Sequence, residues 1–124
     1  MLNILIIGLG GFFGAISRYV IGSWIAQRWG HEFPVGTFVV NISGCFFIGL
    51  AMSLLVERMI LSPQWRLFMV IGFLGAYTTF STFEYETGSL LKDGEILYAL
   101  FNITLSVVVG FIALKLGDVL GKLL

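Results

Sequence analysis

The sequence predicts an all-α integral membrane protein with four transmembrane helices in a single domain over residues 1–124. Hydrophobic residues make up 58% of the chain and charged residues 11%, and the mean hydropathy is +1.00. A soluble domain of this length could not bury so much apolar surface. The apolar residues stand in four long runs, each close to the roughly 20 residues that a helix needs to cross a bilayer. Within these runs they occupy consecutive positions rather than alternating ones, which strongly favours helices over a transmembrane β-barrel.

Short polar segments separate the predicted spans. The spans are expected near Leu2–Ile25, Val35–Val56, Trp65–Tyr85 and Ile96–Leu116. The connections read RWGHEFP, ERMILSPQWR and, as the most polar part of the chain, EYETGSLLKDGE. The first run has no basic region before its apolar core and no cleavage-like break, so we expect it to remain as a helix of the mature protein.

The first predicted helix carries small residues on one face. Gly10, Gly14, Arg18 and Gly22 recur at four-residue spacing, and residues at that spacing lie along one side of a helix. Small residues let a second helix approach closely. Arg18 lies one to two turns inside the span, where its guanidinium must find carbonyls, a carboxylate or water, or else extend to the membrane surface.

Polar stripes occur in the second and fourth predicted helices. Thr37 and Asn41 share a face in one, and Asn102, Ser106 and Gly110 share a face in the other. An amide inside a membrane is costly unless it is hydrogen-bonded. Each stripe therefore indicates either contacts that hold helices together or the lining of a polar pathway.

The third predicted helix is the most informative segment. It reads GFLGAYTTFSTFEYE, in which glycines precede a cluster of threonine and serine. Such a cluster favours a helix that is broken near mid-membrane, because hydroxyl groups can bond to the backbone groups that a break frees. Broken helices present their partial charges at the bilayer midplane, where ions can bind. The alternative is a continuous helix whose hydroxyls bond to the preceding turn.

Other classes of site lack the residues they require. Cys45 is the only cysteine and is read as a small apolar filler, and His31 is the only histidine and is read as a solvated loop residue. No nucleophile, base and orienting group can be assembled from these two, so an enzyme is not expected. The chain also lacks a basic patch for nucleic acid.

The charged residues near the helix ends give only a weak preference for one orientation. With four spans, one face carries Arg58, Arg66, Lys115 and Lys122, and the other carries Arg28 and Lys92, with Arg18 added if it leans that way. A single orientation remains an alternative. If the chain inserts both ways up, an antiparallel homodimer becomes available.

Three motifs together resemble the Fluc (CrcB-type) family of fluoride channels. They are GGFFGAISRY in the first helix, GTFVVNISGCFFIG in the second and GFLGAYTTFSTFEYE in the third. The resemblance covers essentially the whole chain. It implies an antiparallel, dual-topology homodimer in the bacterial inner membrane that exports fluoride passively through two pores.

The resemblance also implies roles for particular residues. The amide of Asn41 would donate to fluoride, and Phe80 and Phe83 would present the electropositive edges of their rings. Further contacts along the fluoride pathway would come from Ser81, Thr82, Asn102 and Ser106. Arg18 would lie near a vestibule or act as a structural anchor. A structural sodium ion at the dimer centre would be held by the backbone carbonyls of Gly75 and Thr78.

Neutral donors suit a small, strongly hydrated anion, because they replace its water without holding it too tightly to conduct. Glu84 and Glu86 are unexpected beside an anion pathway, and we expect a solvated pair at the interface.

Two other functions fit four short spans. A small multidrug-type, proton-coupled exporter would need a membrane-embedded carboxylate, but the first helix carries Arg18 instead of an acid. A structural subunit of a larger complex would move no ion at all.

Overall fold

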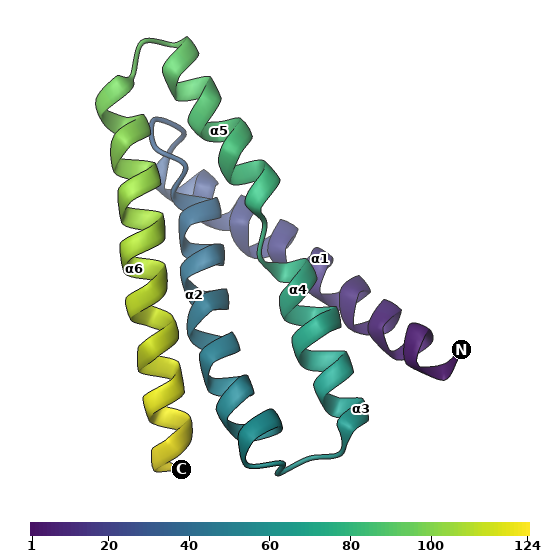
Figure 1. The fold of residues 1–124 in the computed structure, drawn as a ribbon. Coiled ribbons are helices and arrows are strands. Elements are labelled where there is room, and N and C mark those ends of the chain that lie inside the picture. The colour runs from purple at the N-terminus through teal and green to yellow at the C-terminus, as the bar shows by residue number, and fades with distance from the viewer.

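The computed structural model describes residues 1–124, and its regular elements are all helices (Figure 1). Four helical stretches are long and apolar enough to cross a membrane: Leu2–Trp29, Val35–Glu57, Pro63–Lys92 and Ile96–Leu123. The predicted four-helix integral membrane protein is therefore confirmed. All four stretches extend further than predicted at one end or both, because helical hydrogen bonds continue through the polar residues at the membrane surface.

The chain forms eight helical segments in order. They are α1 (Leu2–Trp29), α2 (Val35–Ala51), the π-helix η1 (Met52–Glu57), α3 (Pro63–Arg66), the π-helix η2 (Leu67–Leu74), α4 (Gly75–Tyr77), α5 (Phe80–Lys92) and α6 (Ile96–Leu123). Helices α2 and α6 lie side by side, while α1 crosses the others diagonally and packs against η2 and α2 (Figure 1). The C-terminus and the connection between η1 and α3 lie at the same end of the molecule.

The expectation of a polar connection around residues 84–95 is wrong over most of its length. Helix α5 continues to Lys92, and the turn to α6 is confined to three residues around Gly94, whose φ is 79°. The reason is that Phe83, Thr87 and Leu90 recur at three- to four-residue spacing and are buried on one face of α5, which packs against α6. The polar residues between them lie mostly on the other faces.

The glycine face predicted on the first helix is confirmed. A Cβ atom added at Gly14 would overlap the carbonyl oxygen of Phe73, and one added at Gly10 would overlap that of Phe68. On the facing helix, a Cβ at Gly72 would lie 2.6 Å from the carbonyl oxygen of Ile7. These close approaches bring α1 directly onto the backbone of η2.

Helices α2 and α6 are held together in a similar way. A Cβ added at Gly117 would overlap the carbonyl oxygen of Phe46, and one added at Gly49 would overlap that of Leu114. The Sγ atom of Cys45 lies 3.4 Å from the Cβ position of Gly110, so Cys45 packs against α6 as a small apolar residue.

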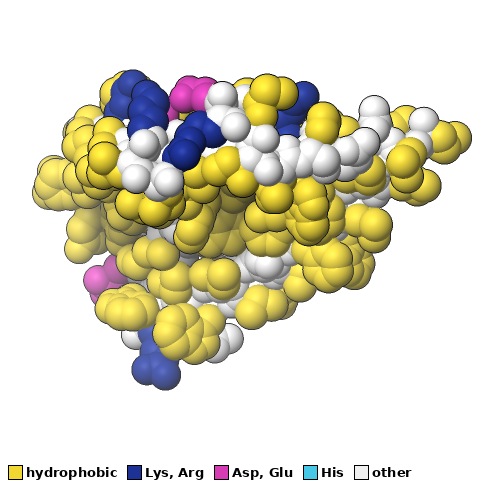
Figure 2. Space-filling view, turned by 90° about the horizontal axis from the view of Figure 1, so that it is seen from below, with side chains coloured by type: hydrophobic (Ala, Val, Ile, Leu, Met, Phe, Trp, Pro, Cys, Tyr) yellow, Lys and Arg dark blue, Asp and Glu magenta, His cyan; other side chains and the backbone are white.

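Most of the apolar surface is not buried within the chain. Only 20 of the 124 residues are buried, and large aliphatic and aromatic side chains are exposed along every span. Figure 2 shows hydrophobic side chains covering most of the visible surface, with charged side chains gathered in small groups. Lipid or another protein chain must cover this surface, because a soluble monomer does not expose so much.

Candidate functional site

The third helical stretch is interrupted at Thr78 and Thr79. Helix α4 ends at Tyr77 and α5 begins at Phe80. Thr78 has φ −84° and ψ 154°, and Thr79 has φ −146° and ψ 120°, which are extended conformations. Two extended residues within a helix leave neighbouring N–H and C=O groups without their usual partners, and these groups need other partners away from water.

Asn41 on α2 supplies two of those partners. Its Oδ1 atom accepts a hydrogen bond of 2.8 Å from the backbone N–H of Thr79, and its Nδ2 atom donates one of 3.0 Å to the carbonyl oxygen of Thr79. The amide of Asn41 thus replaces the helical hydrogen-bond partners of both the N–H and the C=O of Thr79. Of the two sequence interpretations, contact between helices is the one that these hydrogen bonds support.

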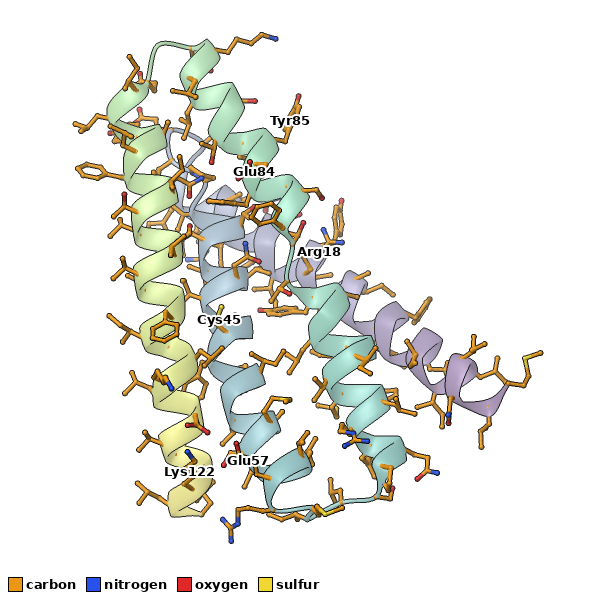
Figure 3. The ribbon with its side chains drawn as sticks, in the orientation of Figure 1. Arg18, Cys45, Glu57, Glu84, Tyr85 and Lys122 are labelled. Carbon is orange, nitrogen blue, oxygen red and sulfur yellow. The ribbon has the colours of Figure 1, made fainter.

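Arg18 on α1 supplies another hydrogen-bond partner for the interrupted backbone. Its Nε atom donates a hydrogen bond of 3.0 Å to the carbonyl oxygen of Ala76, which in a continuous helix would accept from the N–H of residue 80. Figure 3 shows Arg18 beside the junction between α4 and α5. The expectation that its guanidinium would find a carbonyl is confirmed. Its other N–H groups make no hydrogen bond within the chain.

Two backbone carbonyls at the interruption lose their helical donors. In a continuous helix the N–H of Thr79 would bond to Gly75, but here it donates to Asn41. The N–H of Thr82 would bond to Thr78, but here it donates over 3.3 Å to the side-chain oxygen of Thr79, which caps α5. The carbonyl oxygens of Gly75 and Thr78 are therefore free of the bonds that a continuous helix would give them.

A cavity of about 370 Å³ opens on one side of the interruption. It brings together four of the predicted pathway residues: Asn41, Phe80, Phe83 and Ser106. The two aromatic rings lie 5.9 Å apart between centroids, at an interplanar angle of 47°. Phe83 is 8% exposed and Phe80 is 74% exposed, so one ring is fixed within the chain and the other projects from it. We call this space the aromatic cavity.

A second cavity, of about 360 Å³, also reaches the interruption at Thr79. Its lining includes Arg18, Thr37, Thr82 and Glu86, and it is more polar than the aromatic cavity. Thr79 lines both spaces. We call this second space the polar cavity. Thr79 therefore borders both the polar and the aromatic cavity, whereas Thr78 borders the aromatic cavity alone.

The expectation of a solvated glutamate pair is wrong for Glu86. Glu84 is exposed, but Glu86 is only partly exposed and lines the polar cavity. Its Oε1 atom is buried and has no hydrogen-bond partner. The two residues differ because positions 84 and 86 point to different sides of α5, which only the packing of that helix could reveal.

A chain of hydrogen bonds connects α6 to α5 behind the aromatic cavity. The hydroxyl of Ser106 donates to the Oδ1 atom of Asn102 over 3.4 Å, and the Nδ2 atom of Asn102 donates to the hydroxyl of Thr87 over 2.9 Å. That hydroxyl donates to the carbonyl oxygen of Phe83 over 2.8 Å. Asn102 is 1% exposed and does not line either cavity. It connects Ser106 to the backbone that carries Phe83.

One further residue predicted for the fluoride pathway lies outside both cavities, and two buried residues with hydroxyl groups were not predicted. Ser81 is exposed and lines neither cavity. Sequence reasoning missed Thr87, although it stands four residues after Phe83 and so shares its face of α5. It also missed Tyr77, which is buried and whose hydroxyl lies 2.9 Å from the hydroxyl of Ser43.

Comparison with known proteins assigns the family. The sequence model described as "CrcB-like protein, Camphor Resistance (CrcB)" matches residues 5–118. The chain belongs to the CrcB-like family. It is 50% identical over 118 residues to a protein of Solibacter usitatus (strain Ellin6076), covering 95% of this chain and 97% of that one. It is 45% identical over 124 residues to a protein of Geotalea uraniireducens (strain Rf4), covering 100% of both. Both CrcB-like relatives carry the name "Fluoride-specific ion channel FluC".

Proposed function

We propose that this CrcB-like protein is a fluoride-selective channel that releases fluoride from the cell passively, down its electrochemical gradient. The observation that carries the proposal is the pair of cavities that Thr79 lines, in a chain whose relatives at 45–50% identity are named fluoride-specific channels. The pair of cavities gives a small ion a route that needs no large opening between helices.

The residues of the aromatic cavity suit a small anion. The NH₂ group of Asn41 has two N–H bonds, and one of them is used on Thr79. The other remains for an ion in the cavity. The edges of the rings of Phe80 and Phe83 are electropositive and attract an anion without a formal charge. Such neutral groups let a strongly hydrated ion enter and leave.

Four hydroxyl and amide side chains would extend this route. Thr82 and Ser106 would contact fluoride from the two cavities they line. Asn102 would act through its hydrogen bonds to Ser106 and Thr87. Ser81 would contribute at an exposed position on α5, beside the route rather than in it.

A second copy would complete the pathway. Phe80 projects from the chain with 74% of its surface exposed, so the aromatic cavity has one open side. Phe80 and Ser81 are both exposed on α5, just past an interruption that we place near mid-membrane. We infer that an antiparallel, dual-topology homodimer covers them. The weak charge bias between the two ends is consistent with insertion in both orientations.

The freed carbonyls of Gly75 and Thr78 fit a structural sodium ion. Carbonyl oxygens are suitable ligands for an alkali cation, and these two lose their helical donors to Asn41 and to the side chain of Thr79. Two copies would together supply four oxygens. The ion would neutralise the repulsion between these carbonyl dipoles and hold the interrupted helices together.

One observation favours the alternative, a small proton-coupled exporter. Glu86 is a partly buried carboxylate in the polar cavity, and an exporter of that class needs an embedded acid. The contrary observation is Arg18, which lies on the wall of the same cavity and would repel a cationic substrate. The two functions differ in whether transport depends on a proton gradient.

The test is anion release from liposomes that contain the purified protein, at neutral pH and with a protonophore present to remove any proton gradient. We expect rapid loss of fluoride, read by an ion-selective electrode, and no loss of chloride. Fluoride retention with the protein intact would contradict the channel. Drug release that depends on an imposed proton gradient would support the exporter instead.

A further inference from the structure

The connection between the second and third spans lies at one membrane surface and is unusually apolar. The spans end at Glu57 and begin again at Pro63. Between them, Met59, Ile60 and Leu61 are all exposed. Apolar side chains next to a span end are stabilised by insertion at the boundary between lipid headgroups and acyl chains.

Two arginines flank this apolar segment. Arg58 precedes it, and its Nη1 atom donates a hydrogen bond of 3.1 Å to the carbonyl oxygen of Gly121 near the end of α6. This bond fixes the guanidinium near the C-terminus and leaves its other N–H groups free. Arg66 follows in the last turn of α3 and is exposed. Neither arginine forms an ion pair within the chain.

The same end carries an aromatic side chain and further charge. Trp65 is 49% exposed, as is common for tryptophan at the level of the headgroups. Lys122 is paired with Asp118 at 3.0 Å, and Glu57 lies near Lys122 (Figure 3). Lys115 on α6 has no ion-pair partner either, and its Nζ atom lies 5.7 Å from the ring centroid of Phe111. The two arginines are the unpaired basic groups that flank the apolar connection.

We propose that this end of the molecule, from Arg58 to Arg66, binds anionic phospholipids. The two guanidinium groups would hold the phosphodiester of a lipid such as phosphatidylglycerol, since arginine donors match phosphate oxygens. Met59, Ile60 and Leu61 would lie among the upper parts of the acyl chains. The proposal does not depend on fluoride conduction.

The opposite end also carries exposed tryptophans and two basic residues, Arg28 and Lys92, but carboxylates outnumber these basic residues in its connections. Its connection between α1 and α2 contains His31 and Glu32, and the turn before α6 contains Asp93 and Glu95. Carboxylates there repel anionic headgroups. The two ends of one chain would therefore differ in lipid preference.

Tryptophan fluorescence can test this at each end separately. The double variant Trp24→Phe/Trp29→Phe keeps Trp65 as the only tryptophan, and Trp24→Phe/Trp65→Phe keeps Trp29 at the opposite end. Each full-length protein is placed in liposomes with brominated phosphatidylglycerol or brominated phosphatidylcholine, and quenching gives the relative affinity of the two lipids.

We expect Trp65 to be quenched preferentially by phosphatidylglycerol, with a preference of about fivefold for each arginine. Adding Arg66→Gln, which leaves the bond from Arg58 to Gly121 intact, should reduce the preference, and adding Arg58→Gln as well should abolish it. Trp29 should show no preference. Equal quenching of Trp65 by the two lipids, or a preference that survives both substitutions, would overturn the proposal.

Discussion

Asn41 illustrates how a single side chain can permit an irregular backbone inside a membrane. Its amide matches the N–H and the C=O of Thr79 at the same time. An apolar side chain would leave both groups unpaired, at a cost of about 1–3 kcal/mol each. Asn41 still has one N–H free to face the aromatic cavity. The interrupted backbone and the proposed passage of fluoride therefore depend on the same side chain.

Replacing Asn41 by aspartate should impair both roles. A carboxylate can still accept from the N–H of Thr79, but it cannot donate to the carbonyl oxygen, and its charge repels an anion in the cavity. We expect fluoride release from liposomes to slow by at least about tenfold, which corresponds to roughly 1.4 kcal/mol in the barrier.

The matched control for this substitution is Asn3→Asp, at an exposed position near the N-terminus. It adds the same charge away from both cavities and should leave fluoride release unchanged. Equal rates for the Asn41 variant and the unsubstituted protein would show that this amide is not on the route.

Thr87 allows a similar test of the hydrogen bonds behind the aromatic cavity. In Thr87→Val the shape is retained, but the buried amide of Asn102 loses its acceptor. We expect a loss of about 1–3 kcal/mol in stability, measured as a lower thermal unfolding midpoint in detergent.

Thr104→Val is the comparison, because Thr104 is exposed on α6 and its hydroxyl makes no hydrogen bond within the chain. It should unfold at the same temperature as the unsubstituted protein. Similar behaviour of the two valine variants would mean that the hydroxyl of Thr87 contributes nothing.

At the scale of elements, close contact between helix backbones positions the interrupted segment. Glycines on α1 bring it onto η2, just before the interruption, and this places Arg18 within reach of Ala76. Without that approach the guanidinium would have no carbonyl to bind. The glycine face is therefore part of the site although it contacts no ion.

Substituting alanine along α1 should show which glycines matter. A Cβ at Gly14 would overlap the carbonyl oxygen of Phe73, so the helices must move apart, and we expect Gly14→Ala to lower stability by about 1–3 kcal/mol. Gly8 has no neighbouring atom within 4 Å of its Cβ position. Gly8→Ala should leave the unfolding midpoint unchanged or raise it, since alanine favours helix. If the two variants unfold alike, the close contact is not what holds α1 in place.

The sequence predicts the elements better than it predicts the contacts between them. Four spans follow from long apolar runs, because a bilayer imposes the same length on each. The helical course of residues 84–92 was missed because local polarity suggested a connection, whereas packing of Thr87 and Leu90 against α6 keeps the helix going. The two hydrogen bonds between Asn41 and Thr79, which are 38 residues apart, depend on tertiary geometry that spacing cannot reveal.

At the scale of the whole molecule, the proposed sodium ion would link two copies through the carbonyls of Gly75 and Thr78. Removing it should therefore weaken the dimer. When sodium salts are replaced by N-methyl-D-glucamine salts throughout purification, we expect a lower unfolding midpoint and more monomer. A ligand at a hundred times its dissociation constant contributes about 2.7 kcal/mol. An unfolding midpoint and a monomer fraction that do not change without sodium would contradict this role.

If fluoride passes the interruption through the aromatic cavity, its release should depend on the ring of Phe80. The measurement is the rate of fluoride release from liposomes for Phe80→Ile beside Phe101→Ile, which alters an exposed ring on α6 outside both cavities. We expect Phe80→Ile to abolish or strongly slow release, because isoleucine has no electropositive ring edge, and Phe101→Ile to conduct normally. Normal release through a folded Phe80→Ile protein would mean that fluoride does not pass through the aromatic cavity.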